Sequence, residues 1–196
     1  MLCQPWTWKE KILWLRPFTQ QDAMCHAEIE FQDDAIEYLK PYSESKPEWI
    51  KNYDFSKWSH SWAVDFDGDL VGRVSLFNYR SPGKFDAKEA EDAFRSNDSG
   101  SERNILDTPT DERQYAIVIK SQLNRQGLGS QASEKLIRYA FDELDIKLLV
   151  AVVHPENKKC IGLLKKLKFR HSDEVKKRAV EMPDYYQNGF LRFLLP

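Results

Sequence analysis

Apolar and polar residues alternate in the first half of this chain with the period of a β-strand. In SWAVDF the residues Trp62, Val64 and Phe66 alternate with others, and this stretch is followed by Asp67-Gly68 and then by Leu70–Phe77. The short apolar run Ile12–Leu15 also predicts a strand. An Asp-Gly pair between two such segments predicts a β-hairpin. Gly72, inside the return strand, indicates a bulge or a close approach of another backbone.

The second half of the chain alternates apolar runs with segments of helical spacing. Two runs are apolar enough to be buried strands, Tyr115–Lys120 and Leu148–Val153, and each is followed by an amphipathic segment, Ser130–Leu144 and Asn157–Leu167. A strand, a glycine-containing turn, a helix, a strand and a helix thus follow one another. Closing strands are expected at residues 169–171 and 190–195.

Capping and proline signals divide the segments between these elements. Thr19 is a candidate N-cap, and Asp22 three residues later favours a first helical turn. Residues 33–59 are predicted to form short helical pieces broken at Pro41 and Pro47. Residues 80–113 are polar, and a connection of this length is usually functional or mobile. We therefore expect one domain, residues 1–196, with a polar insertion at about 80–113.

Composition narrows the classes of function. The chain has 196 residues, 29 basic and 31 acidic, and a net charge of -2, which gives no global reason to expect binding to nucleic acid or to an anionic membrane. The three cysteines are widely spaced without a CxxC pair, which argues against a disulfide scaffold and a zinc site. No secretory signal or apolar run of about 20 residues is present, so the cytoplasm is the expected location.

The glycine turn is the first candidate for chemistry. A strand that enters a helix through Gly127 and Gly129 leaves the first N–H groups of that helix pointing at whatever lies beyond it, and the helix dipole favours an anion there. Residues 126–130 therefore suit a phosphate or pyrophosphate, with Arg125 as an added charge. The P-loop lysine is missing, and Ala132 stands where a dinucleotide fingerprint has its third glycine. A structural turn without a ligand is the alternative.

Two motifs extend this interpretation. NRQGLG, with Asn124 in first place, is similar to the [QR]-x-x-G-x-[GA] pattern of the GCN5-related N-acetyltransferase (GNAT) family, and NKKCIGLLKKLKF is similar to the family's N-x-x-[AS]-x-x-[LV]-[YL]-x-K-x-G-F. Cys160 and Lys168 depart from the second pattern. The opening LRPFTQQDA and the hairpin DGDLVGRVSL also resemble this family, and the opening is closest to its Rim-type branch, which acetylates ribosomal proteins or small amines.

The resemblance implies a fold, a cofactor and a set of binding residues. The fold is mixed α/β (α+β), with a mostly antiparallel central sheet flanked by helices. Acetyl-CoA is the implied co-substrate, with no metal. Backbone groups near the end of the fourth family strand would bind pantetheine, and the glycine turn would bind pyrophosphate. The positions implied are Ile117, Val118, Ile119, Asn124, Arg125, Gln126, Gly127, Leu128, Gly129, Ser130, Asn157 and Cys160.

The resemblance also suggests catalytic candidates. Many relatives place a tyrosine general acid where this chain has Leu164, which leaves that role open or gives it to Tyr185 or Tyr186. Cys160 falls in the first turn of a helix, where the dipole lowers a thiol pKa, so it is a candidate to assist the departing CoA sulfur. Packing is the alternative for Cys160, and Asn157 is both a catalytic candidate and a candidate N-cap.

The general base is open among His60, His154, Glu28 and Glu112, and a relay through bulk water is a further alternative. Aromatic residues Trp58, Trp62, Tyr79 and Tyr115 either line an acceptor site or belong to the core.

The expected activity is acetyl transfer to a primary amine, with a protein or peptide N-terminus as the favoured acceptor, by a monomer or homodimer. A small-amine or antibiotic acetyltransferase and a non-catalytic CoA-binding sensor or interaction domain are the alternatives.

Overall fold

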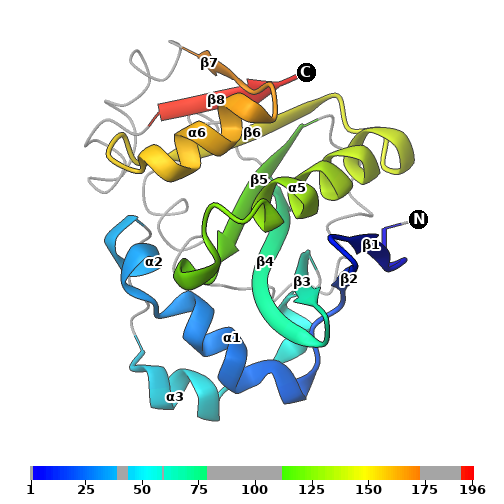
Figure 1. The fold of residues 1–196 in the computed structure, drawn as a ribbon. Coiled ribbons are helices and arrows are strands. Elements are labelled where there is room, and N and C mark those ends of the chain that lie inside the picture. Colours follow the sequence, from blue (N-terminus) through cyan, green and yellow to red (C-terminus); the bar gives the residue numbers. More distant parts are fainter. Residues whose placement is uncertain (1, 39–43, 59, 79–111, 173–190) are drawn as a thin grey trace. The chain divides into compact units, whose positions relative to one another are not determined.

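A computed structural model describes residues 2–38, 44–58, 60–78, 112–172 and 191–196 (Figure 1). Most of the predicted insertion, together with Pro41, Tyr79, Tyr185 and Tyr186, lies outside the described residues.

Eight strands form one sheet in the order β1-β2-β3-β4-β5-β6-β8-β7. β5 and β6 pair in parallel, whereas the pairs β1–β2, β2–β3, β3–β4, β6–β8 and β7–β8 are antiparallel. The predicted mixed, mostly antiparallel sheet is therefore confirmed. The strands are β1 Trp6–Trp8, β2 Lys11–Arg16, β3 Ser61–Phe66, β4 Asp69–Asn78, β5 Glu112–Ile119, β6 Leu148–Val153, β7 Arg170–Ser172 and β8 Leu191–Leu195.

Helices flank this sheet, and most of them are short. The α-helices are α1 Ala23–Glu30, α2 Asp33–Tyr38, α3 Lys46–Lys51, α5 Leu128–Arg138 and α6 Lys158–Lys166. Short 3-10 helices are formed by Gln20–Asp22, Phe55–Trp58 and Ser121–Leu123, and a π-helix by Tyr139–Glu143. In the described part of the chain, no helix has both the length and the apolar character that crossing a membrane requires.

The chain divides into two compact units. Unit 1 comprises Met1–Leu76 and Ala116–Asp145, and unit 2 comprises Phe77–Tyr115 and Ile146–Pro196. The boundary crosses β5, so this strand supplies residues to both units. Each unit is described by itself below.

In unit 1 the predicted hairpin forms the centre of the sheet. β3 and β4 pair from Ser61↔Ser75 to Phe66↔Asp69, with a register shift after Val64. Gly72 lies opposite Val64, and a Cβ atom added to it would come within 2.6 Å of the Val118 carbonyl oxygen and 2.5 Å of Ile119 Cδ1. The sequence left a bulge and a close backbone approach as alternatives, and both occur at this position.

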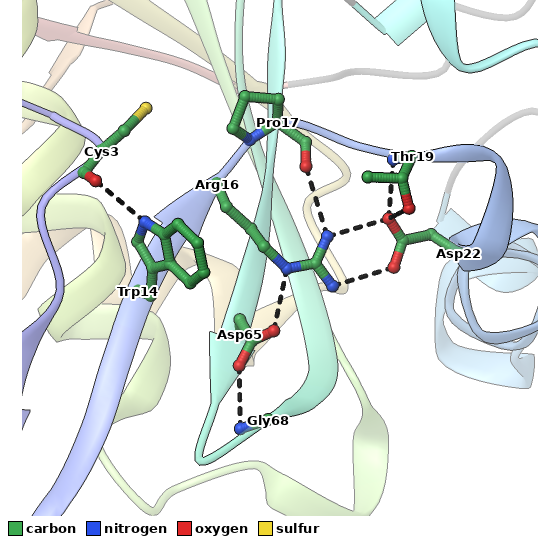
Figure 2. A network of polar contacts seen from close by, with 8 residues as sticks. All are labelled: Cys3, Trp14, Arg16, Pro17, Thr19, Asp22, Asp65 and Gly68. Atoms are coloured by element: carbon green, nitrogen blue, oxygen red, sulfur yellow. Dashed lines mark hydrogen bonds and ion pairs between the residues drawn. The ribbon is translucent and has the colours of Figure 1, made fainter.

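Arg16 joins the start of the chain to the hairpin, as Figure 2 shows. Its guanidinium donates two hydrogen bonds to the Asp22 carboxylate, at 2.8 and 2.9 Å, and a third to Asp65, at 2.9 Å. Asp22 also accepts from the backbone and hydroxyl of Thr19, which completes the predicted capping box. Burial opposes ionisation of Asp22, but the bonds from Arg16 and Thr19 outweigh it and lower the Asp22 pKa.

Three local expectations need correction. Pro47 does not interrupt a helix but stands in the first turn of α3, where its missing N–H costs nothing. α5 begins at Leu128, two residues earlier than predicted, and gives way to the π-helix after Arg138. The first residues of the chain, which showed no strand pattern, form β1.

Candidate functional site

The two edges of β5 carry different backbone groups. The Lys120 N–H donates to the Val71 carbonyl on β4 at 2.8 Å. Backbone groups alternate in direction along a strand, so those of Val118 also face β4, consistent with its carbonyl lying against Gly72. Ile117 and Ile119 therefore direct their backbone groups to the opposite edge. Pantetheine binding by Ile117 and Ile119 stays a prediction, and the backbone groups of Val118 face β4 instead of this edge.

Gln32, which follows α1, occupies the end of that second edge. Its Nε2 donates to the Ile119 carbonyl at 3.0 Å, and its Oε1 accepts from the N–H and the hydroxyl of Ser121 at 2.8 and 3.0 Å. By donating to Ile119 and accepting from Ser121, two residues later, the Gln32 amide makes the pair of hydrogen bonds that the backbone of a neighbouring strand would make. Gln32 thus fixes the end of β5 where the glycine turn begins.

The glycine turn itself has the geometry that an anion site needs. Gly127 is the N-cap of α5 in the left-handed region, with φ 94°, and offers no side chain to cap the helix. The first intrahelical bond of the turn runs from the Gln131 N–H to the Gly127 carbonyl at 3.1 Å. The backbone N–H groups at the first positions, Leu128 and Gly129 among them, therefore have no acceptor within the helix. A phosphate at this end suits both these donors and the helix dipole.

Gly127 is also required by its surroundings. A Cβ atom at this position would lie 3.0 Å from Trp8 Cζ2, a tight contact that the Trp8 ring would have to relieve, and the φ of 94° would strain any other residue. The sequence left a ligand site and a structural turn as alternatives for this glycine. It did not reveal the contact with Trp8, because nothing in the local pattern connects two residues so far apart in the chain.

A polar cleft of about 460 Å³ opens beside the end of β5 in unit 1. Glu28, one of the candidate bases, lines this cleft and pairs with Lys120 at 3.3 Å. The other lining residues are Phe31, Gln32, Asp33, Lys46, Ser121 and Gln122. The cleft therefore has carboxylates and ammonium groups, which suit a ligand that carries both charges.

In unit 2, Asn157 and Cys160 lie together at the start of α6. The Asn157 side chain accepts a hydrogen bond from the Cys160 N–H at 3.0 Å, so Asn157 is the helix N-cap, as predicted. The thiol differs from expectation. Burial raises the pKa of Cys160 to about 11, because desolvation disfavours the charged thiolate. Cys160 is therefore a neutral thiol at physiological pH.

The remaining candidates are dispersed. His60 is buried, and its carbonyl accepts from the Leu76 N–H; His154 accepts at Nδ1 from the Glu156 N–H. Leu164 is fully buried, as a core residue would be. Trp62 and Tyr115 are buried, and Trp58 packs against a buried cluster, so all three serve the core. Among the described residues, no group of three or more His, Cys, Asp or Glu side chains could hold a metal ion.

Comparisons with known proteins identify the family and the fold. Residues 13–170 match the family model of the acetyltransferase (GNAT) domain. An acetyltransferase of the GNAT family from Bacillus anthracis is similar in structure, with a TM-score of 0.67 at 15% identity over 99% of this chain and 96% of that one. No curated protein sequence matches the chain significantly.

Two further similar structures contain coenzyme A. Mycobacterium smegmatis RimJ, in complex with a CoA disulfide, has a TM-score of 0.65 at 14% identity, over 98% of this chain and 85% of that one. RimL, a ribosomal alpha-N-protein acetyltransferase in complex with coenzyme A, has a TM-score of 0.63 at 13% identity, over 98% and 97%. These likenesses establish a shared fold. Because the family model covers most of its length, the chain belongs to the GNAT acetyltransferase domain family.

Proposed function

We propose that this protein is an acetyl-CoA-dependent N-acetyltransferase that acts on a primary amine. The observation that carries the proposal is the glycine N-cap of α5, which leaves backbone donors at the helix start directly after the open edge of β5. A pyrophosphate binds such donors well, and GNAT membership makes coenzyme A the ligand to expect.

The proposed binding residues divide by the part of coenzyme A that each would hold. Ile117 and Ile119 bind the amide groups of pantetheine through their backbone, while residues 124–130 bind the pyrophosphate, with the exposed Arg125 as an added charge. Bound acetyl-CoA supplies the acetyl group as a thioester. Because Gln32 already engages the Ile119 carbonyl, the Ile119 N–H and both groups of Ile117 are the main donors and acceptors for pantetheine.

The proposed acceptor is a protein or peptide N-terminus. RimL, among the similar structures, is named as an alpha-N-protein acetyltransferase. The cleft that Glu28 lines also suits a peptide end, since its carboxylates attract an ammonium group and its lysines attract an acidic side chain nearby. Glu28 is the candidate base that lines this cleft.

Cys160 and Asn157 are proposed in more limited roles. Asn157 positions the first turn of α6 by capping it. Cys160, as a neutral thiol, would act only as a weak hydrogen-bond donor, since its raised pKa removes the thiolate from consideration.

The test combines turnover with cofactor binding. The protein is assayed with acetyl-CoA against peptide N-termini and small amines, and CoA affinity is measured by calorimetry for the parent, Gly129→Glu and Gly162→Glu. Gly129→Glu is expected to raise the CoA dissociation constant at least tenfold, about 1.4 kcal/mol, by placing a carboxylate at the anion site. Gly162 has open space around it, so Gly162→Glu is a matched control.

The outcomes separate the alternatives. Turnover of small amines without peptides would favour a small-amine or antibiotic acetyltransferase. CoA binding without turnover of any amine would favour a sensor or interaction domain. If Gly129→Glu binds CoA as the parent does, the assignment of the pyrophosphate site is wrong.

A further inference from the structure

The hairpin before β2 presents two residues to the glycine turn. β1 and β2 pair with Trp8 opposite Lys11, so the turn between them consists of Lys9 and Glu10 alone. Both have a left-handed backbone, with φ 50° and 63°. Asn and Gly are the usual residues in such a turn. A lysine and a glutamate held in this conformation need compensating contacts from neighbouring structure.

Those contacts are made with the glycine turn. The Lys9 ammonium donates to the Gln126 carbonyl at 3.2 Å and lies 4.5 Å from the centre of the Trp8 ring. The Trp8 ring in turn fills the space beside Gly127 where a Cβ atom would be. Two consecutive residues of the hairpin therefore contact two consecutive residues of the turn.

The Lys9 contact acts on the peptide unit that an anion would use. The Gln126 carbonyl and the Gly127 N–H belong to the same peptide. A cation at the oxygen polarises that peptide and strengthens its N–H as a donor, as in other chains of hydrogen bonds. The ammonium also adds a positive charge near the start of α5, where the helix dipole already favours an anion.

The hairpin lies outside the part of the chain that defines the family. The family model begins at residue 13, within β2, so Trp8 and Lys9 precede it. The match to the family model therefore does not include the two residues that contact the glycine turn.

We propose that Trp8 and Lys9 are positioning residues for the phosphate-binding turn: Trp8 sets its conformation through Gly127, and Lys9 raises its affinity for the pyrophosphate of coenzyme A through Gln126. This inference rests on the proposed function, because it needs coenzyme A as the ligand.

The experiment compares ligands with and without phosphate. Dissociation constants for CoA and for pantetheine are measured by calorimetry for the parent, Lys9→Gln and Lys11→Gln. Lys11 is in the same hairpin, but its ammonium pairs with Asp67 at 3.4 Å, so its loss changes net charge equally without touching the turn. Lys9→Gln is expected to weaken CoA binding about fivefold, less at high salt, and to leave pantetheine binding unchanged. Lys9→Arg is expected to retain most of the affinity.

A second pair of variants tests Trp8. Trp8→Leu is expected to weaken CoA binding more than Trp6→Leu, because the Trp8 ring lies against Gly127, whereas the Trp6 ring lies under the Lys135 ammonium, 5.6 Å from its centre. Circular dichroism confirms that each variant is folded, and the comparison with pantetheine separates an effect on the turn from a general loss of structure.

The results distinguish this inference from the proposed function. If the parent binds CoA and Lys9→Gln binds it equally well, or if Lys11→Gln or pantetheine shows the same loss, the role of Lys9 is wrong. If Trp8→Leu and Trp6→Leu behave alike, the role of Trp8 is wrong. A parent that binds no CoA would overturn the proposed function and this inference with it.

Discussion

At Cys160, two physical effects act on one thiol in opposite directions. Its place in the first turn of α6 favours the thiolate, and its burial favours the neutral thiol. Burial prevails, because the helix dipole contributes about 1 kcal/mol, whereas removing a thiolate from water costs several. A sequence shows helix position directly and burial only indirectly, so the prediction of a lowered pKa was wrong in direction.

This difference predicts the reactivity of Cys160. In a variant that carries Cys3→Ser and Cys25→Ser, iodoacetamide at pH 8 is expected to alkylate the folded protein about two-hundredfold more slowly than the urea-unfolded chain, following the thiolate fractions at pKa values near 11 and 8.5. Mass spectrometry measures the rate. A rate that matches the unfolded chain would show that the pKa of Cys160 is not raised, and a faster rate would show that the thiol is activated.

The two hairpin turns of unit 1 offer a matched pair of substitutions. Lys9-Glu10 and Asp67-Gly68 all have positive φ, but only the second turn has a glycine. Glu10→Gly is expected to raise the free energy of unfolding by about 0.5–1 kcal/mol, since relief of the left-handed strain exceeds the entropy of an added glycine.

Gly68→Ala makes the opposite change, from glycine to a residue with a side chain in the second turn. Gly68 has open space around it, so only its φ of 91° disfavours the added side chain. This change is expected to cost about 1 kcal/mol. Urea denaturation measures both. Equal stability of Glu10→Gly and the parent would show that the first turn is not strained.

Among the elements, buried apolar runs were predictable and edge elements were not. Leu148–Val153 forms β6 with the predicted bounds, because a run that is apolar on both faces has few alternatives to a buried parallel strand. β1 was missed, because three residues are too few to show an alternation of apolar and polar positions. Its pairing with β2 is visible only in the folded structure. Asn157 was predicted as a cap because its signal lies within three residues of sequence.

α1 shows a further limit of patterns. Its buried face carries His26 and Glu30, and Arg73 from β4 reaches Glu30 at 2.6 Å. The His26 ring stacks on Phe18 at 4.0 Å and its Nδ1 lies 3.1 Å from the Tyr53 hydroxyl. A polar residue among apolar helix positions does not reveal from sequence whether it is buried, because its hydrogen-bonding partners are unknown. These residues were therefore not singled out from the sequence.

This buried group predicts how stability depends on pH. Burial is the main cause that lowers the His26 pKa, although Glu30 opposes it, so the folded state keeps His26 neutral while the unfolded state takes up a proton below about pH 6.5. Burial alone would raise the pKa of Glu30, but Arg73 and His26 hold it well below its usual range. Both lowered pKa values make the folded state more stable at neutral pH than in acid. As the pH falls, the contribution of His26 is lost first, because the pKa of an unfolded histidine lies above that of an unfolded glutamate.

Between pH 6.5 and 5, His26 is therefore expected to cost up to about 1.4 kcal/mol of unfolding free energy per pH unit. His26→Gln should flatten this slope in urea titrations. His171→Gln, at an exposed histidine of β7, is the control. A slope that His26→Gln leaves unchanged would assign the acid sensitivity to other groups.

For the whole molecule, the contacts that shape the candidate site join residues far apart in the chain. The motifs located residues 124–130 and 157–160, since each is continuous in sequence. Gln32, Trp8 and Lys9 were not found, because Gln32 lies 87 residues from Ile119 and Lys9 lies 117 residues from Gln126. No local period or spacing carries information over such distances without the fold.

The shared strand β5 leads to a prediction about cooperativity. All six tryptophans precede Leu76 and so belong to unit 1, whereas Cys160 belongs to unit 2. Because β5 contributes residues to both units, unfolding one unit removes part of a strand from the other. In urea, tryptophan fluorescence and pulsed alkylation of Cys160 in the single-cysteine variant are expected to give the same midpoint.

Coenzyme A should then shift both midpoints together. A ligand at a hundred times its dissociation constant stabilises the folded state by about 2.7 kcal/mol. The proposed pyrophosphate turn lies in unit 1, so a shift confined to fluorescence would mean that the units unfold separately despite the shared strand. A shift seen by alkylation of Cys160 as well would show that stabilisation at the turn reaches unit 2. Gly129→Glu is the control, because coenzyme A is expected to shift neither midpoint in a variant that does not bind it.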